Sequence, residues 1–374
     1  MPVNPARCAI RALVVVTGLA TTPAFAADPD AIAKALVAAF NGTNSTSRVA
    51  AFEASYAAAS ASGDDVTISD FRVTVLSATV TVPRVVVTGA ATREKGGFTA
   101  RSMSFDGGTI SSSVFTAKWD AADIENPSIL SPEEIGQRGF QLEGKTKIEK
   151  IKITPAGLDV PVVDIDALTT TNLETNGTIN SSGSISGIKI RQVLFNGTPF
   201  AATLSALGYQ SDFAIDVAGD ANLDLTTNAT TLRSFTIDIA GVGKLSMDGN
   251  YTLPVRNNSA AMDQASLGSL HVRFDNTGIV ERVLDMQARR AGIDRGKFVD
   301  QVSGALPLAL SSLQNKAFEN KVFAALKTFL GDPRSISISA SPKEPVRLDA
   351  IKAAAESAPQ TIPDLLGADI TAND

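Results

Sequence analysis

Cysteine and histidine are almost absent from this sequence. Its 374 residues include one cysteine, Cys8, and one histidine, His271. A structural zinc site takes about four Cys, His or acidic ligands, mostly Cys and His, so the residue counts exclude a zinc site of this kind. If an N-terminal segment containing Cys8 is removed, disulfides are excluded as well. The fold must then be stabilised by its core and its backbone hydrogen bonds.

Aromatic and charged residues are also scarce. Aromatic residues make up 6% of the chain, and 17 of them are Phe against one Trp and three Tyr. Phe suits core filling better than a wet recognition surface, where Tyr and Trp are usual. Charged residues make up 19%, below the usual quarter or so. With 44% hydrophobic residues, this composition predicts a globular protein with a sizeable core.

Residues 1–26 have the layout of a cleavable secretory signal. Arg7 and Arg11 precede a short apolar run, and the segment ends in the small-x-small sequence Ala24-Phe25-Ala26. The run is too short, and too interrupted by Thr, Gly and Pro, for a membrane-spanning helix. We therefore expect cleavage near Ala26, a periplasmic or secreted location, and a mature protein that is not integral to the membrane.

The mature chain is expected to be acidic. Loss of the two leader arginines leaves 31 Lys and Arg against 39 Asp and Glu, a net charge of about −8. An acidic surface is a poor match for nucleic acid, whose binding depends on cationic contacts to phosphates. We expect no nucleic-acid partner.

The dominant hydrophobic period from about residue 49 to 274 is two. Val, Ile and Thr alternate with polar residues, and Gly, Asn and Asp recur every 8–12 residues or so, which is typical of an antiparallel meander. No repeat of fixed length emerges, so a propeller is not predicted. The sequence predicts a mainly β (α+β) fold: an elongated, curved antiparallel β-meander or half-barrel, with a helical segment inserted before a final strand.

Helical periodicity is confined to the two ends of the chain. A short helix is expected over 28–40, with Asp28 as its cap. Further helices are expected over 279–291, over 295–306 after the cap Asp294, and along an apolar stripe from 307 to Pro333. The alternating segment 334–342 then predicts a strand, which such a helical crossover can return to the same sheet. A short helix over 349–357 and a tail complete the chain.

These changes of texture divide the chain into sections. We expect the signal peptide at 1–26, an N-terminal helix and first β-section at 27–130, and a second β-section at 131–270. A strand–helices–strand section at 271–345 and a C-terminal helix and tail at 346–374 follow. The Pro-rich stretch 125–140 marks the expected break between the two β-sections.

No motif for catalysis or metal binding stands out. His271 has Ser269 two residues away, but no G-x-S-x-G elbow accompanies it, so a structural or surface role is favoured over a catalytic one. Carboxylates recur along expected strands, at Asp159, Asp164 and Asp166 and again from Asp212 to Asp224. A calcium site needs acids on one tight loop, so most of these should be a solvated sheet face. We expect no catalytic, cofactor-binding or metal-binding residue, and no cofactor.

The stretch "TIDIAGVGKLSMDGNYTL", residues 236–253, contains a fragment similar to a phosphate-binding loop. A Walker loop requires G-x-x-x-x-G-K-[ST] followed by a helix. Here Asp238 occupies the first Gly position, Leu245 follows Lys244, and the next residues alternate like a strand. We interpret Gly241 and Gly243 as a bend, a bulge or a close approach of backbone to a neighbour.

Three stretches, "GVGKLSMDGNYTLPV", "SLHVRFDNTGIVERVL" and "PRSISISASPKEPVRL", give the chain its resemblance to the AsmA-like group of bacterial envelope proteins and the uncharacterised β-rich periplasmic proteins around it. The likeness covers most of the mature chain and is one of pattern. It implies an elongated, curved sheet whose concave apolar face holds lipid chains or a partner strand. This sequence is shorter than the larger members, and its N-terminus has the layout of a cleavable signal instead of a membrane anchor.

Several functions are compatible with this sequence. The first is a non-enzymatic envelope protein that binds lipid or another hydrophobic ligand in a β-sheet groove. The second is an assembly or structural factor that uses sheet edges to bind an envelope protein partner. A hydrolase acting through carboxylates ranks third, and a filled β-core without any ligand is the simplest outcome. The shape of the sheet, open and concave or closed and filled, discriminates among them.

Overall fold

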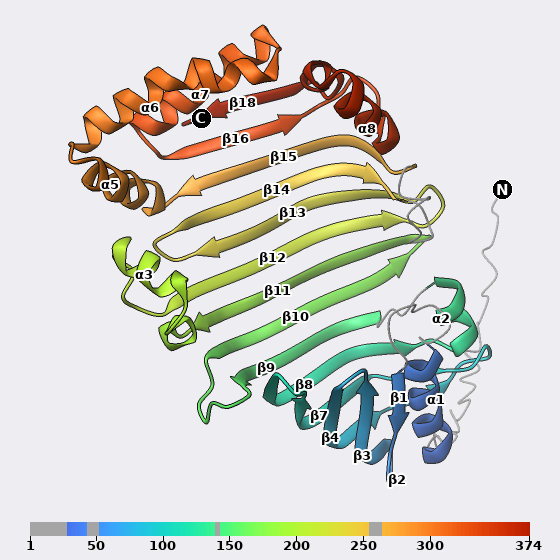
Figure 1. Ribbon diagram of the computed structural model, residues 1–374. Helices are drawn as coiled ribbons and strands as arrows, with labels where there is room; N and C mark the ends of the chain where they lie inside the picture. Colours follow the sequence, from blue (N-terminus) through green and yellow to red (C-terminus); the bar gives the residue numbers. More distant parts are fainter. Residues whose placement is uncertain (1–27, 43–51, 139–142, 254–263) are drawn as a thin grey trace, which may run out of the picture.

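The computed structural model describes residues 28–42, 52–138, 143–253 and 264–374. The expected signal peptide at 1–26 lies outside this part of the chain. Within it, eighteen strands form one large sheet whose pairings are all antiparallel, and most of the helices follow the strands in sequence (Figure 1). This confirms the predicted mainly β fold.

The strands run as follows: β1 Phe52–Ser55, β2 Ala58–Ser62, β3 Asp65–Val75, β4 Ala78–Thr88, β5 Ala91–Thr92, β6 Phe98–Thr99, β7 Ser102–Ser111, β8 Phe115–Ile129, β9 Glu143–Pro155, β10 Val163–Thr175, β11 Thr178–Ile190, β12 Phe213–Asp224, β13 Ala229–Ile239, β14 Gly243–Thr252, β15 Ser266–Asn276, β16 Ser335–Ala340, β17 Val346–Arg347 and β18 Ala368–Ala372. The helices are α1 Pro29–Gly42, α2 Pro132–Arg138, α3 Pro199–Ala206, α5 Ile279–Ala291, α6 Arg295–Leu310, α7 Lys316–Gly331, α8 Leu348–Ser357 and α9 Ile362–Leu365, with 3₁₀ turns η2 Gln192–Phe195, η3 Ser311–Leu313 and η4 Pro359–Thr361.

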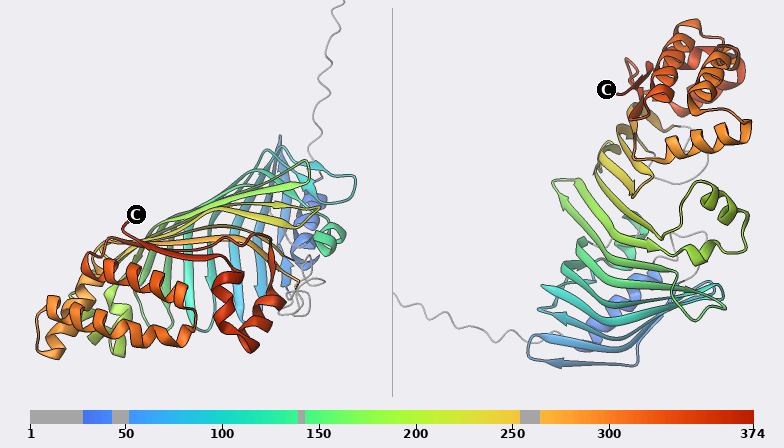
Figure 2. Two further views of the ribbon diagram at one scale, coloured as in Figure 1. Left: turned by 90° about the horizontal axis from the view of Figure 1, so that it is seen from above. Right: turned by 90° about the vertical axis from the view of Figure 1, so that its left-hand side faces the viewer.

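The sheet is a meander in which nearly every strand pairs with its neighbour in sequence. Both β1 and β2 pair with β3, and the order continues through β4, β7, β8 and β9. From β9 each strand pairs with the next up to β16, which pairs with the last strand, β18. Figure 2 shows the result as an elongated, twisted and curved sheet, open at its two ends.

The core fills the concave side of the N-terminal strands. Helix α1 packs on β1, β2 and β3, and its Ile32 and Leu36 belong to the same buried cluster as Ile68 of β3 and Val85 of β4. All buried members of this cluster are at most 4% exposed. The alternation of strand residues and the 3.6-residue period of α1 therefore converge on one apolar layer.

A row of apolar residues crosses one face of the sheet from the N-terminal to the C-terminal strands. Residues directly opposite each other on paired strands share a face, so a single row can be followed across the molecule. The row contains Ile68, Val85, Phe105, Ala122, Ile148, Leu168, Ile185, Val217, Ile237, Leu245, Phe274 and Ile336.

A transverse line of left-handed residues bends the N-terminal two thirds of this sheet. Asp70, Gly107, Lys150 and Gly187 all have positive φ, on β3, β7, β9 and β11. The residues just before the last three lie in one register row, because Asp106 is opposite Ala121 and Glu149 leads through Ala167 to Ser186. At each of these residues the in–out alternation shifts by one, as in a β-bulge, so the strand bends while its apolar side chains stay on one face.

The helical crossover returns the chain to the sheet as expected, because β16 pairs with β15 across α5, α6 and α7. The predicted helix beginning at Pro307 is wrong: Pro307 lies inside α6, which runs on to Leu310. The break comes at Gln314, which has positive φ, and Asn315 begins α7 by accepting the Phe318 backbone N–H at 3.0 Å. A capping side chain, and not the proline, sets this boundary.

Two further segments differ from expectation. The stretch after β11, expected to continue as strand, forms η2 and α3 instead. The expected tail ends in strand β18, whose Ile370 lies opposite Ile338 of β16. The five residues of β18 show neither a clear period-two alternation nor a helical period. Their strand structure depends on pairing with β16. Between the two expected β-sections, β8 pairs directly with β9 across α2.

Candidate functional site

The apolar face is covered at the N-terminal strands and largely uncovered over the middle of the sheet. On β3 and β4 its side chains lie beneath α1 and are almost completely buried. On β10 to β15 the same row continues with Leu168, Ile185, Val217 and Ile237, all of them only half-buried. Leu245 on β14 is 36% exposed, and Ile338 on β16 is 53% exposed. We call this half-buried apolar surface of β10–β15 the trough.

The trough is bordered by helices at both ends. Helices α1 and α2 lie over the N-terminal strands, and α5, α6 and α7 lie at the C-terminal strands, on the same side of the sheet as α3 (Figures 1 and 2). At α7, Val322, Ala325 and Phe329 are buried. Helix α1 thus buries the apolar face at the N-terminal strands, whereas at the C-terminal strands Ile336 stays half-buried and Ile338 stays exposed.

Segment 192–209, which contains η2 and α3, closes one side of the trough. The ring centroid of Phe213, at the start of β12, lies 6.0 Å from that of Phe195 and 5.4 Å from that of Tyr209. The Tyr209 hydroxyl donates to the Gly241 carbonyl at 2.8 Å, and the Arg282 guanidinium lies over its ring at 4.6 Å. Burial raises the pKa of the Tyr209 phenol. The aromatic contacts and the hydrogen bond hold this segment against the strand ends.

The only tryptophan lies at the N-terminal border of the trough. Trp119 on β8 is opposite Gly108 on β7, and its ring occupies the space where a Cβ of Gly108 would stand. It packs against the core beneath α1, and its indole N–H is buried without a hydrogen-bond partner in the described part of the chain. Its position beside β9, where the exposed part of the face begins, makes it an intrinsic probe of the trough.

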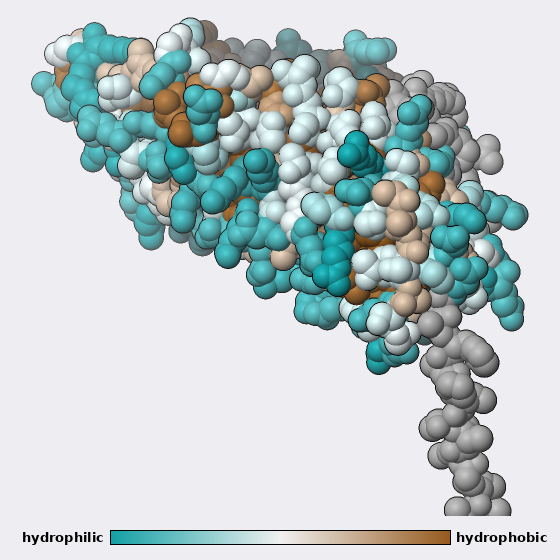
Figure 3. All heavy atoms as spheres, turned by 90° about the horizontal axis from the view of Figure 1, so that it is seen from below, coloured by the Kyte–Doolittle hydropathy of each residue, from teal (hydrophilic) through white to brown (hydrophobic). Residues whose placement is uncertain are grey.

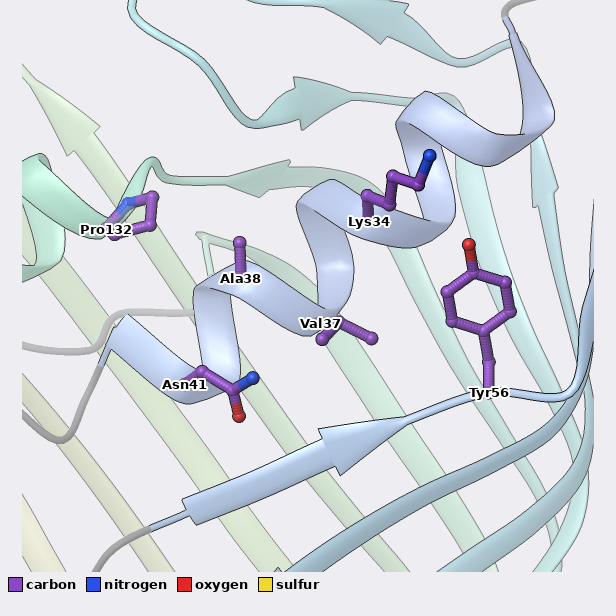
Figure 4. Close-up of a pocket in the computed structure, with 6 residues that line it drawn as sticks. All are labelled: Lys34, Val37, Ala38, Asn41, Tyr56 and Pro132. Carbon is purple, nitrogen blue, oxygen red and sulfur yellow. The ribbon is translucent and has the colours of Figure 1, made fainter.

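A separate pocket of about 450 Å³ lies beside α1. Figure 4 shows Lys34, Val37 and Asn41 of α1 on one side of it, with Tyr56 and Pro132 also lining it. Its lining is mostly apolar, with the amine of Lys34, the amide of Asn41 and the phenol of Tyr56 as polar groups. This pocket is adjacent to the N-terminal strands covered by α1 and does not form part of the trough.

The opposite face of the sheet is polar, and its side chains form ion pairs and hydrogen bonds with one another. The His271 Nδ1 lies 3.1 Å from Asp248 Oδ1 on the neighbouring strand, and both side chains are exposed. Ser269 accepts a hydrogen bond from Asn250 at 3.0 Å. His271 and Ser269 thus have separate partners, in agreement with a surface role. Seen from below, the molecule is covered mostly by hydrophilic and weakly polar residues, with hydrophobic ones in small patches (Figure 3).

Several of the carboxylates singled out in the sequence accept hydrogen bonds from the backbone or from an arginine. Asp164 pairs with Arg191 at 2.9 Å, Asp216 accepts the Gly187 N–H at 2.8 Å, and Asp212 accepts the Gln192 N–H at 3.0 Å. Hydrogen bonds from the backbone N–H groups of residues 227 and 226 lower the pKa of Asp224. No group of three or more His, Cys, Asp or Glu side chains that could hold a metal ion occurs among the described residues.

The Gly241–Gly243 stretch is a hairpin turn, as its alternating context indicated. Strand β13 ends at Ile239 and β14 begins at Gly243, which lies opposite Ile239. A Cβ on Gly243 would stand 2.5 Å from the Phe274 ring and 2.7 Å from the Asp275 carbonyl oxygen. The close approach of backbone to a neighbour is therefore confirmed as the reason for this glycine.

The described helices include none with the length and apolarity needed to cross a bilayer. A family model described as "Uncharacterized protein" matches residues 172–373, and the chain belongs to that family. This match covers the strands from β11 to β18 and all of α3 to α9. The search of the curated proteins gave no match.

Proposed function

We propose that this protein is a non-enzymatic envelope protein that binds a lipid or another long apolar molecule in the trough. The observation that carries the proposal is the contrast along one apolar face, which is almost fully buried under α1 and only half-buried over β10–β15. A contiguous apolar surface of this kind is unusual for a protein without a ligand or partner. The proposal agrees with what the AsmA-like resemblance implies.

Binding would be favoured by the area that remains exposed. Removing apolar surface from water contributes about 25 cal/mol per Å². Burial of apolar surface can therefore supply the binding free energy without a charged group on the ligand. The ion pairs on the opposite face of the sheet take no part in binding. The ligand that fits this surface best has a long apolar part and a headgroup that needs no charged partner on the protein.

The length of the trough suits an acyl chain. Paired strands lie about 4.8 Å apart, so the six strands from β10 to β15 span about 24 Å across the sheet. An acyl chain fills half of a bilayer core of about 30 Å, or about 15 Å. One acyl chain laid across the strands is therefore well accommodated.

The first test is the mass of the protein isolated without detergent. Native mass spectrometry should show the protein with bound lipid, released on denaturation and identified after solvent extraction. Protein recovered only at its bare mass, and unable to take up fatty acid when it is supplied, would contradict the proposal.

A second test locates the ligand. A fatty acid carrying a nitroxide quencher is titrated while the emission of Trp119 is followed. We expect saturable quenching, weakened at least tenfold by the double change Val217→Asn and Ile237→Asn on the apolar face. The matched control, Ala218→Asn with Asp238→Asn, changes exposed residues of the same two strands on the opposite face and should bind as the natural protein does.

Equal binding by the two double variants would place the ligand outside the trough. Circular dichroism of each variant checks that the sheet is intact. Because both target side chains are only half-buried, their replacement should leave the fold in place.

The alternative is an assembly factor that pairs through a sheet edge. It is favoured by the position of β18, which is the last strand of the sheet and pairs with β16 on one side. An edge strand is a ready template for a strand of another chain. A lipid-free protein recovered in a stable complex, with hydrogen-exchange protection gained at Ala368–Ala372, would support this alternative.

A further inference from the structure

Alternate hairpins of the meander meet along one side of the sheet. The turn after β3 and the turn after β7 are neighbours, because Thr79 lies opposite Ser111. The loop after β9 follows, since Pro155 lies opposite Phe115. Segment 191–212, between β11 and β12, and the turn after β13 continue the series. We call these loop tips the rim; the loop after β9, α3 and the turn after β13 lie on the left of Figure 1.

The rim displays large apolar side chains that point to solvent. Leu76 at the first turn is 73% exposed and Val114 at the second is 67% exposed. Leu158 and Val160 in the next loop are also exposed. Leu76 adopts a left-handed conformation with φ of 53°, which is uncommon for a leucine and is usually taken by Gly, Asn or Asp.

Segment 192–211 makes the largest contribution to the rim. Phe200 is 62% exposed, and Val193 and Leu194 are exposed beside it. This stretch of twenty residues, "QVLFNGTPFAATLSALGYQS", contains no charged residue. It is held from beneath by the Tyr209 hydrogen bond and by Arg282, which donates to the Leu207 carbonyl at 3.0 Å. Its apolar residues are thus presented on a fixed support.

The opposite side of the sheet has a different character. Its turns are built on polar residues and glycine, such as Gly63 next to Asp64, and Asn176 with Gly177. The large apolar residues exposed there in the described chain are Leu173, Leu225 and Leu253. Both sides therefore expose apolar residues near their turns, but the rim exposes more of them, and the most exposed ones are Leu76, Val114 and Phe200.

Cationic side chains stand beside the rim. Strand β15 ends at Asn276, opposite Gly243 at the turn after β13, and α5 leaves the sheet from there. The turn between α5 and α6 reaches the same left-hand side of the molecule as α3 (Figure 1). Arg289 and Arg290 in the last turn of α5 are exposed, and neither makes an ion pair with a described residue. Two unpaired cations thus accompany an apolar edge that has few charged residues, among them Asp159 in the loop after β9.

We propose that the rim docks on a lipid bilayer that contains anionic headgroups. The apolar tips would enter the interfacial layer while Arg289 and Arg290 bind headgroup phosphates, the usual combination for peripheral membrane binding. The apolar residues are spread over separate loops along the sheet. Such a line fits a fluid surface better than a protein partner, whose interface needs a compact apolar centre.

The test is sedimentation of the purified protein with phosphatidylcholine vesicles, with and without phosphatidylglycerol. We expect binding to the anionic vesicles that weakens with added salt. Changing Val193, Leu194 and Phe200 together to Ser should lower the partition coefficient at least tenfold, since burial of one large apolar side chain is worth about a factor of ten or more. Changing Leu173 and Leu225 to Ser on the opposite side is the matched control and should leave binding unchanged.

The double change Arg289→Gln and Arg290→Gln should reduce binding to anionic vesicles and remove most of its salt dependence. Absence of binding by the natural protein to either kind of vesicle would overturn the inference. So would equal losses in the rim variant and in its control. Capture of a soluble protein by the rim, without vesicle binding, would show that a protein partner occupies it instead.

This inference is independent of the lipid in the trough. The Arg289→Gln and Arg290→Gln change leaves both the trough residues and segment 192–209 unchanged, so quenching of Trp119 by the labelled fatty acid should persist in that protein. Conversely, the Val217→Asn and Ile237→Asn protein should still sediment with anionic vesicles. Failure of one proposal is thereby distinguishable from failure of the other.

Discussion

The ion pair between Glu134 and Arg93 should set the acid stability of the N-terminal core. The two oxygens of Glu134 accept from the Arg93 guanidinium at 2.7 and 2.9 Å, and one of them also accepts the Ser131 backbone N–H at 3.1 Å. In return, the Ser131 hydroxyl accepts the Glu134 backbone N–H at 3.3 Å. This is a capping box at the start of α2, joined to the loop between β5 and β6. It clamps α2, and with it the buried Ile135, onto the core.

The contribution of this ion pair to the free energy of unfolding follows from the pKa of the Glu134 carboxyl group. The hydrogen bond from Arg93, opposed by burial and aided by Ser131, lowers the pKa of Glu134 from 4.5 to about 2. One unit corresponds to about 1.4 kcal/mol, so the ionised form stabilises the fold by about 3 kcal/mol. Only 14% of the side chain is exposed, so solvent screening is small. The pKa is lower in the folded protein, so this stability is present above pH 4.5 and is lost as pH falls toward 2.

The assay is urea unfolding followed by circular dichroism from pH 7 to pH 2. Glu134→Gln should lower the free energy of unfolding by about 3 kcal/mol at pH 7, and the gap to the natural protein should narrow below pH 4.5. Asp106→Asn is the control, because its ion pair with Arg84 is 3.3 Å long and both side chains are more than half exposed. That change should cost less than about 1 kcal/mol. If the difference in the free energy of unfolding between the natural protein and Glu134→Gln stays constant down to pH 2, the ionised carboxylate is not the source of the stability.

Two further predictions concern the turn after β13. Gly243→Ala should lower the free energy of unfolding by about 1–3 kcal/mol, because the new Cβ would press on the Phe274 ring and the Asp275 carbonyl; thermal unfolding checks this, and an unchanged melting temperature would contradict it. Tyr209→Phe should cost about 1 kcal/mol through loss of the hydrogen bond to Gly241. Limited proteolysis should then cut segment 192–209 faster, and equal cutting rates would show that the ring contacts alone hold it.

The sequence predicted the architecture well wherever a local pattern decides structure. Gly63 and Asp64 form the hairpin turn between β2 and β3, with Ser62 opposite Asp65, in line with the recurring Gly, Asn and Asp of the predicted meander. Period-two alternation identified the strands, and Gly243 was interpreted correctly from the strand-like residues around it. The polar role expected for His271 follows the same logic, since alternation places it on the face away from the apolar row.

Segments decided by tertiary contacts were missed. The residues of η2 and α3 are apolar enough to continue a strand, but Phe195 and Tyr209 fold back onto Phe213. Strand β18 depends on pairing with β16. The turns of the rim carried no recognisable motif, because Leu76, Val114 and Phe200 lie far apart in sequence and only the register of the sheet brings their loops to one side.

Period-two alternation shows that a strand has an apolar face, but it does not show which element covers that face. The trough is a part of the apolar face that no helix covers. A flat sheet of these strands would need a second layer along its whole length. The line from Asp70 through Gly107 and Lys150 to Gly187 bends the strands while keeping their apolar side chains on one side. The bend lets α1 fill the concavity at the N-terminal strands with few residues. The strands after β11 have no left-handed residue in this line, and there the same apolar face continues beyond the reach of α1. The buried core and the open trough thus belong to different parts of one sheet, so binding and release of the proposed apolar ligand would leave the core beneath α1 intact.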